Sequence, residues 1–215
     1  MIEAVPQDWR RFDALELVPT LAGAMEAFHE QGYHATSVRD VANRVGLTVP
    51  ALYYHHGSKE GMLVELLSGS VQHLHARLRA AVVDAGSDPA AQFANFVECI
   101  VLFMAHRREL AVLDAEIRAL SPANRRAYAK VRKQIEDLLL SIVRDGVATG
   151  AFSVAHPQDT VRALLGMLQA VAGWYDPRGI LTPNQLSERY IEITLQTVGS
   201  ASRKALPERK NRRPA

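Results

Sequence analysis

The residues with the clearest chemical potential lie between positions 37 and 59, in the stretch SVRDVANRVGLTVPALYYHHGSK. Ser37 and Asp40 have the spacing of a capping box, and apolar residues follow Val38 at i+3, i+4 and i+7, which predicts a short amphipathic helix. Gly46 can end that helix in a left-handed conformation, and Thr48 can cap a second one. Two short helices joined by a tight turn form the unit that places its second helix in the major groove of DNA.

The second helix of this unit should carry an exposed aromatic edge. Pro50 is tolerated in a first helical turn, Leu52 can bury, and Leu47 can fill the core at the turn. Tyr53 and Tyr54 are adjacent and cannot both face inward on a short helix, so at least one should have an external partner. The spacing alone leaves a DNA role open, because the same geometry occurs in all-helical proteins that bind no DNA.

The stretch from Ala27 to Leu63 resembles the DNA-binding region of TetR-family transcriptional regulators. The resemblance rests on the sequence AFHEQGYHATSVRDVANRVGLTVPALYYHHGSKEGML, and beyond the first third of the chain it extends only to length and helical pattern. It implies an all-α protein, with an N-terminal three-helix DNA-binding domain containing the helix–turn–helix and a C-terminal helical domain for ligand binding and dimerisation. It also implies a repressor released from a palindromic operator in double-stranded DNA by a small-molecule effector.

The resemblance assigns particular positions to DNA. Arg39 is expected to contact a base or a nearby phosphate, and its guanidinium could form a bidentate contact with guanine. Phosphate contacts need small donors and cations, whereas base edges need side chains that reach into the groove. The groove-facing residues are then Thr48, Val49, Pro50 and Tyr53, and the phosphate-facing residues are Ser37, Tyr54, His55 and Lys59. His56 is expected to be a structural histidine.

Charge does not by itself mark the N-terminal region as a DNA-binding domain. Residues 1–60 hold five Lys and Arg against eight Asp and Glu, a net charge of −3, whereas DNA-binding domains are usually basic. Cations and helix N-termini must therefore gather on one face. The last residues, 202–215, hold six Lys and Arg against one Glu, which predicts a solvated basic tail or a weak electrostatic aid to DNA association.

Composition places the chain among ordinary globular proteins. Its 215 residues are 48% hydrophobic and 22% charged, with no apolar run long enough to cross a bilayer and no signal-peptide pattern at the start. The single cysteine, Cys99, excludes an intrachain disulfide and lies in an apolar stretch where a buried packing role is expected. We therefore expect a cytoplasmic protein without membrane contact.

The hydrophobic pattern predicts helices throughout. The first should begin near Val18, with Pro19 in its first turn, and residues 9–11 should form an arm that packs on the domain rather than on DNA. Further helices are predicted over 58–85, 90–106, 109–120, 122–149, 157–175 and 182–198. The predicted division is 1–60 for the arm and DNA-binding domain, 61–200 for the effector and dimerisation domain, and 201–215 for a disordered tail.

The last two long helices have apolar faces wider than one core-facing stripe needs. Burial within one domain would account for this width. The resemblance favours a homodimer through these helices, and a two-fold dimer would present two recognition helices to a palindromic site.

The resemblance also implies an effector pocket among the middle helices, although the same residues could simply be core. The partner would be apolar or amphipathic, because the ending WYDPRGILTPNQLSERY is similar to TetR-type regulators of lipid or steroid catabolism, which often respond to acyl-CoA thioesters. An anionic ligand group could meet Arg107, Arg108 or Arg118. The candidate lining residues are Phe96, Phe103, Met104, Tyr128, Met167 and Trp174, with Phe93 beside them.

Two other classes of function fit less well. An enzyme needs a convergent acid–base or nucleophile set, and the eight histidines lack zinc spacing while Gly-rich phosphate loops and an HExxH motif are absent. We therefore expect no catalysis, no metal and no cofactor. A helical adaptor that binds only protein would explain the apolar faces but would leave Arg39, Tyr53, Tyr54 and Lys59 without a purpose.

Overall fold

The computed structural model describes residues 8–200, and the predicted tail at 201–215 lies outside the described residues. Every regular element in the described range is a helix, which confirms the all-α prediction. No helix in that range is long and apolar enough to span a bilayer. The elements are α1 (Pro19–Gln31), α2 (Val38–Val45), α3 (Val49–His56), α4 (Lys59–Asp84), α5 (Pro89–His106), α6 (Arg108–Val112), the 3-10 helix η1 (Leu113–Ala119), α7 (Pro122–Ala148), α8 (Pro157–Gln169), α9 (Val171–Trp174) and α10 (Pro183–Thr197).

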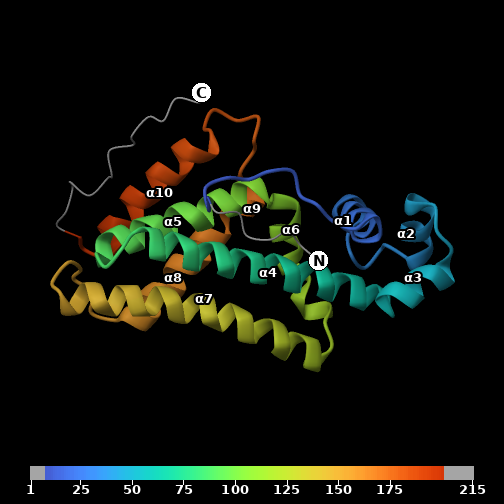
Figure 1. Cartoon of the computed structure of the whole chain (residues 1–215), viewed down its shortest axis with the longest axis horizontal. Coiled ribbons are helices and arrows are strands. Elements are labelled where there is room, and N and C mark those ends of the chain that lie inside the picture. Colours follow the sequence, from blue (N-terminus) through green and yellow to red (C-terminus); the bar gives the residue numbers. More distant parts are fainter. Residues whose placement is uncertain (1–7, 201–215) are drawn as a thin grey trace.

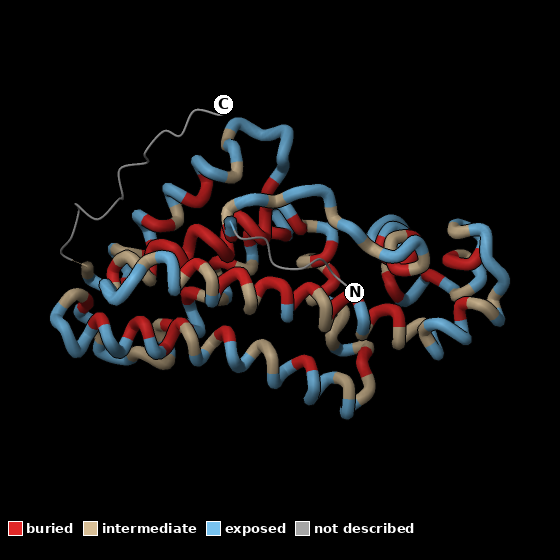
Figure 2. The backbone as a smooth tube through the Cα atoms, viewed as in Figure 1, coloured by how far each residue is buried: buried red, intermediate tan, exposed pale blue. Residues whose placement is uncertain are grey.

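A small head of three helices sits at one end of a larger helical bundle (Figure 1). Helices α1, α2 and α3 form the head, and α4 runs from it into the bundle, where it packs on α5 and α7. Helix α5 is the centre of the bundle, because α4, α7, α8 and α10 all contact it and most of its residues are buried (Figure 2). The head is therefore carried by a helix whose other half belongs to the bundle core.

Local sequence signals fix the helix ends in the head. The Ser37 hydroxyl accepts a hydrogen bond from the Asp40 N–H, and the Asp40 carboxylate accepts one from the Ser37 N–H, which confirms the capping box. Gly46 has φ +67° at the end of α2, a conformation that favours glycine. Thr48 and Ser58 cap α3 and α4 as predicted. The ends of the helices in the head are therefore set by residues close in sequence and do not depend on tertiary packing.

Three expectations were wrong. Leu47 is 40% exposed rather than in the core, because Leu52 already occupies the inward position of the unit. The helix predicted over 157–175 breaks at residue 170, where Gly166 and Gly173 lower helix preference on both sides. The helix predicted over 109–120 divides into α6 and the tighter η1, since side chains of η1 are tied to α7 and to the head.

The N-terminal arm packs on the bundle rather than on the DNA-binding domain with which the sequence grouped it. The Trp9 indole is buried and donates to Asp84 at 3.2 Å, and the Arg10 guanidinium contacts Glu98 at 2.9 Å. Arg77, a fully buried cation that the sequence did not reveal, donates to the carbonyls of Trp9 and Arg11 at 2.8 and 2.9 Å. These contacts fix the arm to the bundle.

Cys99 on α5 is fully buried, as predicted from its apolar surroundings. Burial raises the pKa of the thiol well above its usual range, so it stays protonated. A protonated, inaccessible thiol has a packing role.

Gly61 provides a test of how tightly the head joins α4. A Cβ at this position would overlap the carbonyl oxygen of His56, a backbone atom that cannot move without shifting the turn after α3. We predict that Gly61→Ala lowers the free energy of unfolding by about 1–3 kcal/mol or more, measured by chemical denaturation. The control is Val83→Ala on the same helix, an exposed position where the change should stay within about 0.5 kcal/mol. Equal stability of both variants would contradict the close approach.

Candidate DNA-binding and effector sites

The outer edge of α3 presents the two tyrosines to solvent. Tyr53 is 50% exposed and Tyr54 is 88% exposed, whereas Leu52 is buried and anchors the helix to the head. Pro50 and His55 are also exposed, and Val49 packs partly against the core. Two adjacent aromatic side chains are thus accessible on the surface of this helix, one half-exposed and one almost fully exposed.

The hydroxyls of Ser37 and Thr48 are used in the caps of α2 and α3. The helix N-termini that they cap carry free N–H groups and partial positive charge, which favour a phosphate. Arg39, in the first turn of α2, is exposed. The N-terminal ends of α2 and α3 therefore offer donors that do not depend on the net charge of the head.

Lys59 is placed differently from what the resemblance implied. Its ammonium donates to the carbonyl oxygens of Tyr33 and Thr36, each at 2.9 Å, and lies 4.4 Å from the centre of the Tyr33 ring. The loop between α1 and α2 exposes these carbonyls, and the lysine satisfies them. Lys59 thus holds that loop on the start of α4 rather than projecting from the surface.

His56 is a structural histidine, as expected. Its Nδ1 lies 2.8 Å from the Glu65 carboxylate and its Nε2 lies 2.8 Å from the Thr20 hydroxyl. The imidazole therefore joins α1, α3 and α4.

Arg44 accounts for part of the acidic surplus of the head. Its guanidinium pairs with Glu26 at 3.2 Å and with both carboxylate oxygens of Glu30. The hydrogen bonds from Arg44 hold the pKa of Glu30 below its usual range. These two acids of the head lie on α1 and are paired with an arginine of α2. Helix α3 itself contains no acidic residue.

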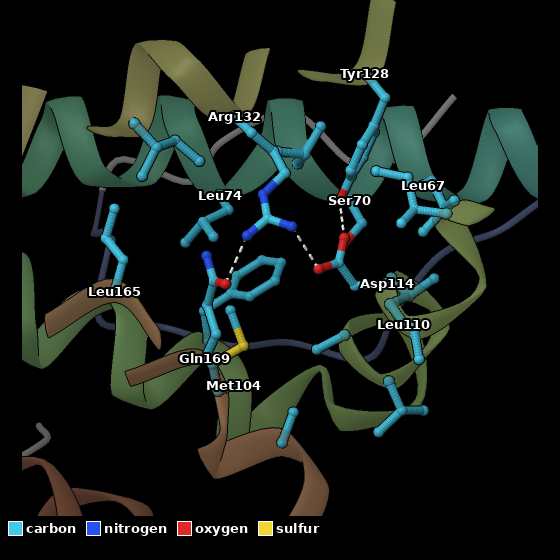
Figure 3. A pocket seen from close by; sticks show the side chains of 18 of the residues that line it. Leu67, Ser70, Leu74, Met104, Leu110, Asp114, Tyr128, Arg132, Leu165 and Gln169 are labelled. Atoms are coloured by element: carbon cyan, nitrogen blue, oxygen red, sulfur yellow. Dashed lines mark hydrogen bonds and ion pairs between the residues drawn. The ribbon is translucent and has the colours of Figure 1, made fainter. Parts of the chain in front are cut away.

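A pocket of about 760 Å³ lies between α4 and the helices from α5 to α9. Its walls are mostly apolar, and it reaches the surface beside the exposed Lys133. Of the six predicted lining residues, Phe103, Met104 and Tyr128 line it. Phe96 is fully buried in the core, Met167 lies outside the lining, and Trp174 lines a separate shallow hollow near Ile180. Figure 3 shows the pocket with side chains from α4, α7 and α8 converging on it.

Four of the polar residues that line the pocket are joined to one another by hydrogen bonds, and we refer to them as the polar cluster: Asp114, Tyr128, Arg132 and Gln169. Ser70, Lys133 and Glu136 also line the pocket. The Arg132 guanidinium donates to Asp114 at 2.7 Å and to the Gln169 side-chain oxygen at 2.6 Å, and the Tyr128 hydroxyl donates to Asp114 (Figure 3). Burial, together with the negative charge of Asp114, raises the pKa of Tyr128, so the phenol remains a donor.

Sequence reasoning missed Asp114, Arg132 and Gln169. The spacing of Tyr128 and Arg132, one helical turn apart, was the available signal, but the partners come from η1 and α8. The arginines considered instead have other roles. Arg107 donates to the carbonyl of Asp13 at 2.7 Å and Arg108 to that of Ala172 at 3.0 Å.

Two polar contacts lie where the pocket wall meets the head and the start of α4. Glu116 on η1 lies 3.6 Å from the His34 imidazole in the loop after α1. Glu60, at the start of α4, accepts hydrogen bonds from the Ser121 N–H at 2.6 Å and from the Asn124 amide at 2.7 Å. The Ser121 N–H, followed by Asn124, lowers the pKa of Glu60. The pocket wall and the head are thus directly linked.

Comparison with known protein families agrees with this arrangement. Residues 21–66 match the family described as bacterial regulatory proteins, tetR family. Residues 86–198 match the Tetracyclin repressor-like, C-terminal domain. The chain belongs to the TetR family. It is therefore a DNA-binding transcriptional regulator rather than an enzyme, and the resemblance seen in the sequence is confirmed.

Individual relatives support the assignment along nearly the whole chain. The HTH-type transcriptional repressor KstR2 of Mycobacterium tuberculosis is 32% identical over 86% of this chain and 91% of its own. The structure of that ketosteroid transcriptional regulator has a TM-score of 0.75 at 28% identity, covering 83% of this chain and 92% of that one. The TetR-family regulator PfmR of Thermus thermophilus has a TM-score of 0.77 at 32% identity, covering 82% of this chain and 97% of that one.

The placement of Lys59 leads to a stability prediction. Lys59→Ala leaves buried or half-buried carbonyls without donors, so we expect the free energy of unfolding to fall by about 1–3 kcal/mol in chemical denaturation. The control is Lys133→Ala, because Lys133 is an exposed lysine paired only with the exposed Asp137 and should contribute less than about 1 kcal/mol. If Lys59→Ala unfolds like the wild type and loses only DNA affinity, the lysine serves DNA instead.

Proposed function

We propose that this TetR-family chain represses transcription as a two-fold homodimer on a palindromic operator and leaves the operator when an apolar or amphipathic small molecule enters the pocket. The observation that carries the proposal is the solvent-exposed pair Tyr53 and Tyr54 on the second helix of a helix–turn–helix. In this division residues 1–60 bind DNA and residues 61–200 bind the effector and the second subunit. A protein that acts on operator DNA works in the cytoplasm.

In the DNA complex, α3 lies in the major groove. Val49 and Pro50 can pack on thymine methyl groups, and Arg39 can reach a guanine or a nearby phosphate. Tyr53 and Thr48 face the groove, and the phosphates are met by Ser37, Tyr54 and His55 together with the N-terminal ends of α2 and α3. Lys59 contributes indirectly by fixing the loop before α2.

The dimer contact we propose uses the outer faces of α8 and α10. Their inner faces pack on α5 and α7, which leaves a second face in solvent. On α8 and α9 that face carries only small residues for several turns, which permits close approach of another helix, and it ends at the exposed Trp174, stacked on Tyr190 of α10. The small residues are Ala163, Gly166, Ala170 and Gly173.

The effector we propose is lipid-derived, an acyl-CoA thioester or a related molecule. A pocket of about 760 Å³ with apolar walls matches the size and character of small-molecule sites. The relative from Mycobacterium tuberculosis is a ketosteroid regulator, and this chain resembles it over most of its length. An apolar body of that kind would be buried against Leu67, Leu74 and Phe103.

Release of DNA follows from the links between pocket and head. A ligand shifts an equilibrium only through a difference in affinity between two states. Asp114 and Glu116 lie on the same short element, so a ligand that displaces the polar cluster also disturbs the contact to His34 and the one between Glu60 and Ser121. Helix α4 transmits that displacement, because its first residues hold the head and its middle residues line the pocket.

Operator binding is tested with Tyr53→Ala and Tyr54→Ala. Each variant should lose about tenfold or more in affinity for a palindromic fragment from upstream of its own gene, because one good contact at the DNA surface contributes on the order of 1–3 kcal/mol. Fluorescence anisotropy at low salt measures the affinity, and unfolding curves should be unchanged. Ile180→Ala removes a fully exposed side chain in the loop between α9 and α10 and should bind like the wild type. No DNA binding by the wild-type protein would favour a helical adaptor.

The dimer face is tested with Gly166→Arg. Because nothing lies near this glycine in the single subunit, the arginine should leave the fold intact and oppose only the approach of a second copy. Sedimentation analysis should show monomers, with operator affinity lost in parallel. Val83→Arg on α4 is the control, an exposed position away from α8 and α10. A dimeric Gly166→Arg protein would move the interface elsewhere.

A further inference from the structure

The polar cluster is notable because it places an ion pair, Arg132 with Asp114, on the wall of a pocket whose lining is otherwise mostly apolar. Arg132 and Asp114 keep 34% and 33% of their side-chain surface exposed although both line the pocket. Figure 3 shows the guanidinium extending from α7 into the space between Asp114 and Gln169, with Leu74, Leu165 and Met104 around it. Burying polar groups in an apolar pocket is costly unless they have partners, so their presence there requires an explanation.

The cluster offers several N–H donors that its own hydrogen bonds do not use. Arg132 uses two of the five N–H groups of a guanidinium in its bonds to Asp114 and Gln169. The Gln169 oxygen accepts from Arg132, which leaves the two amide N–H groups of Gln169 as donors. The Asp114 carboxylate already receives bonds from both Tyr128 and Arg132. A ligand group placed here would therefore meet N–H donors.

We infer that the pocket recognises a ligand with an apolar, ring- or chain-shaped body and a neutral carbonyl oxygen at its inner end, bound by Arg132 and Gln169. This inference rests on the proposed function and adds the chemical feature by which that site would choose its effector. The apolar walls bury the body, and the two donors hold the oxygen.

The charge balance favours a neutral carbonyl over a carboxylate. Asp114 neutralises Arg132 at 2.7 Å, and the other two charged lining residues, Lys133 and Glu136, are paired with Asp137 and Arg162. A ligand carboxylate would therefore bring an unpaired negative charge close to Asp114 in a partly desolvated site. A hydrocarbon, at the other extreme, would cover the remaining N–H groups of Arg132 and leave them without partners. A ketone satisfies the donors without adding charge.

The test uses three bicyclic probes with one carbon frame: 2-decalone, decalin and decalin-2-carboxylate. Each is titrated into the full-length protein below its solubility limit, and the methyl resonance of Met104, which lines the pocket, reports binding by NMR. Because water solvates the ketone better than the hydrocarbon, a purely apolar pocket would prefer decalin. We expect 2-decalone to bind about tenfold more tightly than either of the other probes.

Two variants test whether Gln169 and Arg132 cause the preference for 2-decalone. Gln169→Leu and Arg132→Met remove donors while keeping side-chain volume, and each should weaken 2-decalone about tenfold while leaving decalin within about twofold. Lys130→Gln is the matched control, because Lys130 is an exposed residue of the same helix that does not line the pocket, and it should change neither affinity. Since Tyr128 still donates to Asp114 in both variants, an unfolding curve checks that the pocket is intact.

Each contrary result is decisive. Decalin or the carboxylate binding as tightly as 2-decalone to the wild type overturns the inference, and so does a preference that survives in both variants. A Met104 resonance that no probe moves also overturns it. None of these results affects the operator and dimer measurements, because those use no ligand. Failure of this inference can therefore be distinguished from failure of the proposed function.

Discussion

The structure depends on one continuous helix that belongs to both halves of the protein. Helix α4 has 26 residues and is about 39 Å long at 1.5 Å per residue. Its first residues hold the head through Lys59 and Glu65 and the start of α7 through Glu60. Its middle residues line the pocket, and Arg77 near its far end fixes the N-terminal arm. Because a close-packed interior transmits strain, the proposed release of DNA assigns to this helix the route from the pocket wall to the head.

Apolar packing joins the head to the bundle in one continuous core, and a few polar contacts between the pocket wall and the head add direction to it. Hydrophobic contact tolerates small sliding, but the hydrogen bonds of Glu60 to Ser121 and Asn124 hold only over a few tenths of an ångström. Apolar burial therefore stabilises the two halves, and a few directional bonds set the position of one against the other. An equilibrium between two arrangements needs this combination, since loss of a few bonds changes orientation without unfolding either half.

The pocket likewise combines apolar packing with directional polar contacts. Leucine, methionine and phenylalanine side chains provide its volume, and the polar cluster provides direction within it. The members of the cluster come from η1, α7 and α8, so no single segment of sequence contains the site. The tight winding of η1 belongs to this arrangement, because Asp114 bonds to α7 while Glu116, two residues later, reaches His34.

The local structure of the head could be predicted from the amino-acid sequence alone. Ser37, Asp40, Gly46, Thr48 and Ser58 act through neighbours within a few residues, so their caps and turns could be predicted, and so could the outward-facing tyrosines. The helical class and most helix ends followed from periodicity for the same local reason. By contrast, the loop that Lys59 holds and the arginine that enters the pocket became clear only from the packing of the helices. Those outcomes depend on side chains that are far apart in sequence and meet only when the helices pack, and a pattern read along one chain contains no distances between its helices.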